Sequence, residues 1–149
     1  MTVFPVTAST ISAKSLGKFA IEKYNLSESF TCKLFRTGIN HTYFLSNDEK
    51  KYALRIYSYN WRTKQEIEQE IELLNLLNLL KDNNLSVSFP IKDKEGKFIQ
   101  TINAPEGNRY VVVFSFAEGE KMRFMNHDTC CSIGSLMAKI HKTTLNKTT

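Results

Sequence analysis

The sequence predicts an α+β fold, in which one long helix packs against a five-stranded antiparallel sheet and a further helix flanks the sheet toward each end of the chain. Five short runs of strand-forming residues are separated by turn residues, and a long amphipathic stretch stands between the third and fourth runs. The expected elements are a helix over 12–25, strands over 32–36, 42–46 and 51–57, a helix over 63–81, strands over 97–102 and 109–116, and a helix over 128–141.

The first helix has a recognisable start and end. Ser12 is a favourable N-cap residue, because its side-chain oxygen can accept a hydrogen bond from the free N–H groups of the first turn. Leu16, Phe19 and Ala20 follow at helical spacing and form a short apolar face. We expect the helix to end at Asn25.

The first three strands are predicted to form a meander. Residues 37–41 join the first two strands, and a turn at residues 47–50 leads into the third. Turns at residues 93–96 and 104–108 precede the last two strands, of which 109–116 is the most apolar. Short connections of this kind favour antiparallel pairing.

The long helix begins at a capping box, the Thr-x-x-Glu pattern of Thr63 and Glu66. Its apolar stripe is expected to contain Ile67, Leu73, Leu74, Leu77 and Leu80. The last helix has apolar residues at the spacing i, i+3, i+4 and i+7, namely Ile133, Leu136, Met137 and Ile140.

Composition excludes several classes of protein. The chain has 149 residues, of which 42% are hydrophobic and 23% charged, a globular balance rather than a disordered or collagen-like one. No apolar run approaches the ~20 residues that span a bilayer, and residues 1–5 do not resemble a secretory signal. Cys32, Cys130 and Cys131 have no CxxC spacing, which favours reduced thiols. We therefore expect a cytoplasmic protein with no membrane partner.

The net charge is +5, from 20 Lys and Arg against 15 Asp and Glu. A basic excess suits an anionic partner, either a nucleic acid or a phosphate-bearing ligand. The basic residues are scattered along the chain, so a solvated surface is the preferred interpretation. A small nucleic-acid-binding protein is the minor alternative.

Two charged residues stand where apolar side chains are expected. At about 100° per residue, Glu70 lies in the middle of the apolar stripe of the long helix, where an unpaired carboxylate is costly. In the third strand, Arg55 shares one face with Ala53 and Tyr57. Arg55 alone also fits a strand-edge or snorkelling side chain. Together, Arg55 and Glu70 predict an ion pair between the third strand and the long helix.

The loop at residues 37–41 is a weaker signal. Backbone N–H groups of a glycine-containing loop are able to surround an anion, and a Gly-Ile-Asn hairpin is also an ordinary turn, so both interpretations stay open. His41, His127 and His141 lack metal-ligand spacing and are expected to be surface or hydrogen-bonded residues.

The chain resembles the N-terminal part of the aminoglycoside phosphotransferase superfamily. These are small-molecule kinases with a protein-kinase-like fold, and they include choline kinases and type II homoserine kinases. The segments that carry the resemblance occur in the family's order and are residues 37–43 (TGINHTY), 52–57 (YALRIY), 68–74 (EQEIELL), 111–119 (VVVFSFAEG) and 133–141 (IGSLMAKIH). The resemblance implies a kinase-like N-lobe over residues 1–117, followed by a hinge and the first helix of a second lobe over 118–149.

The resemblance implies a set of nucleotide-binding residues: Gly38, Asn40, Arg55, Glu70, Phe114, Ser115 and Ala117. The loop that contains Gly38 and Asn40 would lie over the phosphates of ATP. Arg55 would contact the phosphates, with Glu70 as its partner on the helix. Protein kinases carry Lys at this strand position, and the forked guanidinium of Arg implies a different phosphate geometry.

Three further residues would bind the adenine base. Phe114 would form the back wall of the adenine slot, and Ser115 and Ala117 would offer backbone C=O and N–H groups to the edge of the base. The resemblance thus implies a lobe that binds ATP within an enzyme transferring the γ-phosphate to a hydroxyl acceptor.

The family's catalytic motif is missing from these 149 residues. Such kinases take their base from a His-x-Asp-x-x-x-x-Asn loop, and that Asn and a later Asp bind Mg²⁺. None of the four aspartates fits the pattern: Asp48, Asp82, Asp93 and Asp128. We therefore expect a truncated chain without catalytic residues or metal ligands, in which Mg²⁺ binds only in the complete enzyme. The alternative is a non-catalytic lone lobe that binds a nucleotide or partner and self-associates through its exposed interface.

Overall fold

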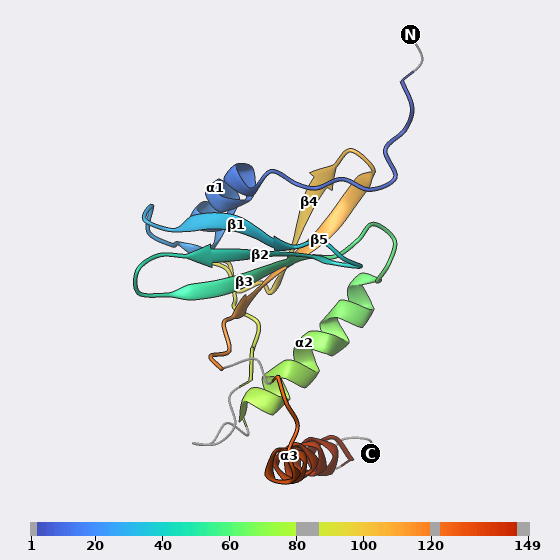
Figure 1. Ribbon diagram of the computed structural model, residues 1–149. Coiled ribbons are helices and arrows are strands. Elements are labelled where there is room, and N and C mark those ends of the chain that lie inside the picture. The colour runs from blue at the N-terminus through green and yellow to red at the C-terminus, as the bar shows by residue number, and fades with distance from the viewer. Residues whose placement is uncertain (1–2, 80–86, 120–122, 146–149) are drawn as a thin grey trace.

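The computed structural model describes residues 3–79, 87–119 and 123–145, and its architecture is the expected α+β one (Figure 1). Its elements are α1 Ala13–Tyr24, β1 Thr31–Arg36, β2 His41–Ser46, β3 Lys51–Ile56, α2 Lys64–Leu79, β4 Ile99–Ala104, β5 Gly107–Ser115 and α3 His127–Leu145. The predicted last two residues of the long helix, 80 and 81, lie outside the described residues.

The five strands form one antiparallel sheet in the order β1-β2-β3-β5-β4. The first three strands are the predicted meander, and β5 pairs with β3, so that β3 is the central strand. Helices α1 and α2 lie on opposite sides of the sheet (Figure 1). The sheet therefore has a core on each face.

The core on the α1 side is the larger one. Its buried residues are Leu16, Ala20, Tyr24, Phe30, Tyr43, Leu45, Leu54, Ile56, Val111 and Val113. Helix α1 has the predicted caps: the side chain of Ser12 accepts a hydrogen bond from the Ser15 N–H, and Asn25 adopts a left-handed backbone conformation. Leu54 and Ile56 point to this face, and Arg55 between them points to the other, as the alternation of β3 predicts.

The core on the α2 side contains Tyr57, Ile67, Ile71, Val112 and Phe114. The predicted stripe of α2 is wrong in one respect, because Leu73 is 42% exposed whereas Ile71 is buried. The helix turns a face centred on Ile67 and Ile71 toward the sheet, and Leu73 lies about 200° beyond Ile71. For the same reason Glu70 stands at the flank of the buried face rather than in its middle, and its side chain is 35% exposed.

The capping box of α2 forms as predicted. Glu66 accepts a hydrogen bond from the Thr63 N–H at 2.8 Å, and the Thr63 hydroxyl accepts one from the Glu66 N–H at 3.3 Å. This pair also lowers the pKa of Glu66, chiefly through the hydrogen bonds from Thr63.

Strand β4 begins two residues later than predicted, because a buried aspartate extends the preceding turn. The carboxylate of Asp93 accepts hydrogen bonds from the N–H groups of Glu95 and Lys97 and from the side-chain amide of Gln100. The chain therefore becomes extended only at Ile99.

Helix α3 is four residues longer than predicted at its C-terminal end, and it contacts α2 at the end remote from the sheet (Figure 1). None of its residues is buried. The predicted apolar face is therefore open in the described part of the chain: Met137 is 52% exposed and Leu136 36%.

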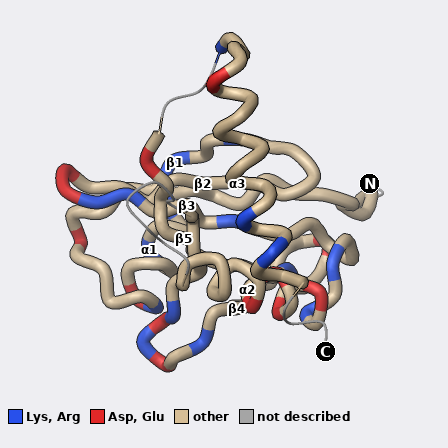
Figure 2. The backbone as a smooth tube through the Cα atoms, turned by 90° about the horizontal axis from the view of Figure 1, so that it is seen from below, with Lys and Arg blue, Asp and Glu red and all other residues tan. Residues whose placement is uncertain are grey.

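Charged residues of both signs are interspersed along the chain (Figure 2). Among the described residues, no helix is both long and apolar enough to cross a lipid bilayer. Cys32, Cys130 and Cys131 are free thiols.

The orientation of α2 is testable by two truncations that each remove three carbon atoms. Ile67→Ala is expected to lower the free energy of unfolding by about 2–5 kcal/mol, because Ile67 is fully buried against the sheet. Leu73→Ala, on the exposed side of the helix, is expected to lower it by less than about 1 kcal/mol. Urea unfolding measures both, and equal losses would contradict the observed orientation.

Candidate functional site

The predicted ion pair between strand and helix is present. Arg55 Nη1 lies 2.5 Å from Glu70 Oε1, which joins the middle of β3 to the second turn of α2. Tyr57 follows β3 on the same face, and its hydroxyl donates a hydrogen bond of 2.9 Å to Glu70 Oε2. Both oxygens of the carboxylate are therefore occupied by partners from one segment of the chain.

Two aromatic rings flank the Arg55 guanidinium. Its central carbon lies 4.9 Å from the ring centroid of Phe114 on β5 and 5.9 Å from that of Tyr57. The Arg55 side chain is nevertheless 36% exposed. A guanidinium has five N–H donors, and the bond to Glu70 uses one of them, so this arginine is able to bind an anion while it stays paired.

Tyr57 remains a hydrogen-bond donor at any physiological pH. Burial raises the pKa of its hydroxyl, and the negative charge of Glu70 raises it further. Sequence reasoning placed Tyr57 beside Arg55 but did not identify it as a partner of Glu70. The alternation of the strand could have identified Tyr57 as a partner, because residues two apart in a strand share a face.

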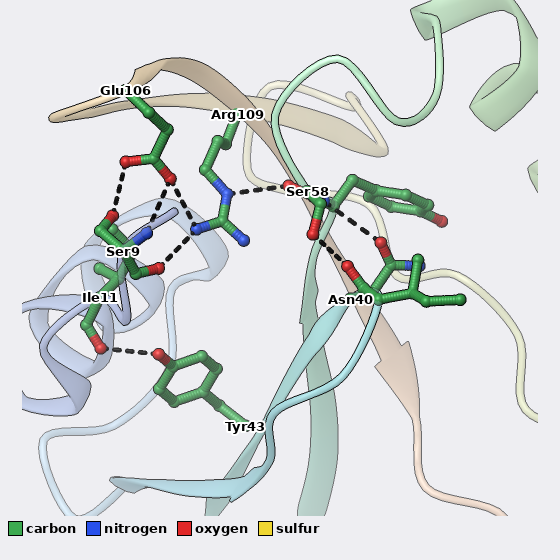
Figure 3. Close-up of polar contacts among 9 residues, drawn as sticks. Ser9, Ile11, Asn40, Tyr43, Ser58, Glu106 and Arg109 are labelled. Carbon is green, nitrogen blue, oxygen red and sulfur yellow. Dashed lines mark hydrogen bonds and ion pairs between the residues drawn. The ribbon is translucent and has the colours of Figure 1, made fainter. Parts of the chain in front are cut away.

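The loop between β1 and β2 is attached to the end of β3 (Figure 3). The Ser58 N–H donates a hydrogen bond of 3.2 Å to Asn40 Oδ1, and the Ser58 hydroxyl donates one to the Ile39 carbonyl. Gly38 is exposed, and a Cβ atom added to it would meet nothing closer than 3.8 Å. The side-chain oxygen of Asn40 is thus engaged within the protein, whereas the backbone around Gly38 is open.

A buried polar cluster lies beside this attachment (Figure 3). Arg109 Nε donates to the Tyr57 carbonyl at 2.9 Å, and Arg109 Nη1 contacts Glu106 Oε1 at 3.2 Å and the Ser9 carbonyl at 2.8 Å. Ser9 in turn donates to Glu106 through both its N–H and its hydroxyl. Sequence reasoning missed this cluster, although Arg109, like Arg55, is a single charge in an apolar strand.

Burial opposes ionisation of Glu106, but the hydrogen bonds from Ser9 and the charge of Arg109 outweigh it. The pKa of the Glu106 carboxyl is therefore lowered, and the carboxylate is ionised at neutral pH.

The two residues expected to face adenine differ in accessibility. The Ser115 N–H donates to the Phe89 carbonyl, and the Ser115 carbonyl accepts from the Ser88 hydroxyl, so both backbone groups already have partners. Ala117 is exposed. Nearby, Lys51 Nζ lies 4.0 Å from the ring centroid of Phe44 and 4.1 Å from that of Phe116.

The residues of the candidate site are distributed along strand β3. Arg55 is three residues from Tyr52, which pairs with Ser115, and three residues in the other direction from Ser58, which holds the loop. At about 3.3 Å per residue along an extended chain, the Cα atom of Arg55 is roughly 10 Å from that of each. The structure therefore brings together Arg55, Glu70 and Phe114, with the Gly38–Asn40 loop and Ser115 toward opposite ends of β3.

Within the described residues, no group of three or more His, Cys, Asp or Glu side chains is arranged to hold a metal ion. The chemistry that this face offers is a paired guanidinium beside aromatic rings and a loop with exposed backbone. Such a face suits an anionic ligand with a flat ring.

No protein-family model matches the chain. It is 30% identical over 141 residues to an uncharacterised protein of Synechocystis sp., covering 94% of this chain and 38% of that protein. It is 23% identical over 133 residues to a homoserine kinase of Rhodopseudomonas palustris, covering 88% of this chain and 38% of the kinase. The chain thus spans about two fifths of the length of these relatives.

Solved structures of two small-molecule kinases share the fold. An amicoumacin kinase, solved with AMP-PNP, Ca²⁺ and Ami, matches with a TM-score of 0.74 at 20% identity, over 89% of this chain and 40% of that one. A spectinomycin phosphotransferase, solved with ADP and spectinomycin, matches with a TM-score of 0.66 at 17% identity, over 91% and 39%.

The fold is that of a kinase-like N-lobe. The resemblance found in the sequence is confirmed: the chain resembles small-molecule kinases of the aminoglycoside phosphotransferase type over the N-terminal part of their length.

His41, at the start of β2, makes stability depend on pH. It is buried, and its Nδ1 atom has no hydrogen-bond partner among the residues that the structure describes. Burial, followed by the charge of Arg109, lowers its pKa below the ordinary 6.5. The unfolded chain therefore takes up a proton at this residue first as the pH falls, so the contribution of His41 to stability is constant above about pH 6.5 and decreases below it.

We expect the urea midpoint of the natural chain to fall between pH 7 and pH 5.5, and His41→Gln to flatten that dependence, because glutamine does not titrate. His127→Gln is the control, since His127 is almost fully exposed. An unchanged pH profile in His41→Gln would show that another group causes the dependence.

Proposed function

We propose that this chain is the ATP-binding lobe of a small-molecule phosphotransferase that transfers the γ-phosphate to a hydroxyl acceptor. The observation that carries the proposal is the Arg55–Glu70 pair, with the aromatic ring of Phe114 beside the guanidinium. The likeness to kinases solved with AMP-PNP and ADP supports it.

Arg55 would hold the phosphates through the guanidinium donors that Glu70 leaves free. Its pairing with Glu70 fixes the side chain and limits the rotamer entropy that phosphate binding would otherwise remove. The exposed backbone N–H groups around Gly38 would lie over the phosphates from the other side.

The adenine base would lie toward the other end of β3. Phe114 would form its back wall, and the Ala117 N–H would donate to the edge of the base. The Ser115 carbonyl would accept from the base with its second lone pair, because the first is used by Ser88. Phe44, on the face of Arg55, is a further candidate to cover the ring.

The sequence and the relatives support a division of the chain into two parts. We propose that residues 1–117 form the nucleotide-binding lobe and that 118–149 form a hinge and the first helix of a second lobe. Transfer also needs a base and Mg²⁺ ligands, and no His-x-Asp-x-x-x-x-Asn pattern occurs in the 149 residues. We propose that these groups lie in the part of the protein that the chain, at about two fifths of its relatives' length, does not span.

The missing motif also favours a second candidate, a lobe that binds a nucleotide or partner without catalysis. A nucleotide bound by either candidate would lie on the same face of the sheet. Both also fit a cytoplasmic location, because ATP is present there and the three cysteines are free thiols.

Nucleotide binding is tested by calorimetric titration with ADP and ATP. We expect Arg55→Ala to weaken binding by roughly tenfold or more, because a charge-assisted contact to phosphate is lost. Glu70→Ala is expected to weaken it several-fold while the fold is retained, because Arg55 loses the partner that orients it. Glu68→Ala on the exposed face of α2 is the matched control and should bind normally.

Unchanged affinity in both Arg55→Ala and Glu70→Ala would contradict the assignment of the site. Binding of oligonucleotides that weakens steeply with salt, without binding of ATP, would favour the nucleic-acid alternative.

We propose that the open apolar residues after the sheet are covered by the rest of the kinase in the complete protein. Phe124, Met125, Met137 and Leu145 are more than half exposed. The chain expressed alone should therefore self-associate as its concentration rises, which sedimentation velocity measures. Replacing Met125 and Met137 by Gln should restore the monomer, and a monomer at all concentrations without any replacement would contradict this proposal.

A further inference from the structure

We propose that Ser58 and Arg109 are positioning residues, which hold the β1–β2 loop in its place before a nucleotide arrives. The inference rests on the proposed function, which assigns phosphate binding to this loop. The hydrogen bonds that attach the loop are present in the free protein. Neither residue belongs to the proposed set of nucleotide contacts.

The β1–β2 loop is attached to the sheet through Ser58. Ser58 forms hydrogen bonds to two consecutive loop residues, to the Ile39 carbonyl and to Asn40 Oδ1 (Figure 3). The loop has little packing to hold it otherwise, since Ile39 is 62% exposed and a Cβ atom added to Gly38 would meet only the Asn40 carbonyl oxygen, at 3.8 Å. Its position therefore depends on Ser58 more than on a core.

Ser58 is held in place by its neighbour in the chain, Tyr57. The Tyr57 N–H donates to the Tyr110 carbonyl at 2.9 Å, and the Tyr57 carbonyl accepts from Arg109 Nε at the same distance. The Tyr57 hydroxyl is bound to Glu70. Tyr57 thus connects the Arg55–Glu70 pair to the segment that holds the loop.

Arg109 is in turn held by a buried cluster. Its side chain is 2% exposed, as is that of Glu106, and the two charges compensate each other. Ser9 completes the cluster, since its carbonyl accepts from Arg109 and its N–H and hydroxyl donate to Glu106 (Figure 3). A buried guanidinium that lost these partners would be strongly unfavourable, so the cluster keeps Arg109 on the Tyr57 carbonyl.

The consequence is preorganisation. A loop that is ordered in the free protein loses less conformational entropy when phosphates bind beneath it. Ligands with phosphates should therefore depend on Ser58, whereas a nucleoside without phosphates should not.

Two measurements on the 149-residue chain test this. Hydrogen exchange of the amides at residues 38–41, without nucleotide, reports the order of the loop. Calorimetric titration with ADP and with adenosine reports the phosphate-dependent part of binding. The variants are Ser58→Ala, which removes the hydroxyl, and Ser58→Thr, which keeps it. Ser27→Ala is the control, because within the described parts of the chain the Ser27 hydroxyl pairs only with that of Ser29, in another exposed loop.

We expect Ser58→Ala to speed exchange in the loop and to weaken ADP binding about fivefold, with adenosine binding unchanged, since one hydrogen bond is lost. Ser58→Thr should restore both values. Equal losses for ADP and adenosine, or no change in loop exchange, would overturn the inference, because Ser58 would then support the fold in general or nothing at all.

The role of Arg109 is tested with two variants, because the loss of a buried arginine is able to unfold the protein. Arg109→Lys keeps the charge and loses the fork, whereas Ser9→Ala removes one donor to Glu106 and leaves Arg109 in place. Both should speed loop exchange while the amides of β2 and β3 stay protected. If both variants fold and the loop amides exchange as slowly as in the natural chain, Arg109 does not position the loop.

Failure of this inference is distinguishable from failure of the proposed function. If neither ADP nor ATP binds the natural chain, the proposed function fails, and loop exchange in the variants still decides whether Ser58 and Arg109 hold the loop.

Discussion

The central strand β3 has side chains that serve two different purposes, and the rest of the structure depends on this alternation. Leu54 and Ile56 point into the apolar core beneath α1, whereas Arg55 and Tyr57 point toward α2. A shift of one residue in the pairing of β3 would bury the charge of Arg55 and expose Leu54 and Ile56. The α1 core therefore fixes the register that places Arg55 opposite Glu70.

The polar contacts on the α2 side are arranged around charges that are only partly withdrawn from water. Arg55 and Glu70 are about one third exposed, so the pair contributes little to stability compared with a buried core residue. Its value lies in orientation, because the guanidinium is held at a fixed place while most of its donors stay available. Arg109 and Glu106 form the opposite case, a fully buried pair whose removal would leave an uncompensated charge.

These two ion pairs meet at Tyr57, which touches Glu70 through its hydroxyl and Arg109 through its carbonyl. One residue thus joins the exposed anion-binding candidate to the buried cluster at the end of the sheet. The residue that follows Tyr57, Ser58, forms the hydrogen bonds to the β1–β2 loop, in which Ile39 is largely exposed.

Local sequence determined the order of the elements and the caps of α1 and α2. The capping box of Thr63 and Glu66, the caps of α1 and the alternation in β3 involve neighbours of at most a few residues, so propensity and spacing were enough to predict them. The Arg55–Glu70 pair was predictable for a related reason, since each residue is the wrong type for its position in a regular element. The rotation of α2 was not, because two apolar faces of similar size competed, and only packing against β5 and β3 selected the one with Ile71.

Tertiary structure alone decided the cluster of Ser9, Glu106 and Arg109 and the attachment of the loop through Ser58. Ser9 and Glu106 are 97 residues apart, and no spacing rule relates them. They meet because the sheet order brings the β4–β5 turn beside the segment that precedes α1. The sequence by itself therefore determined which residues would need partners, and only the folded sheet determined which partners they found, because hydrogen bonds between distant segments depend on the path of the whole chain.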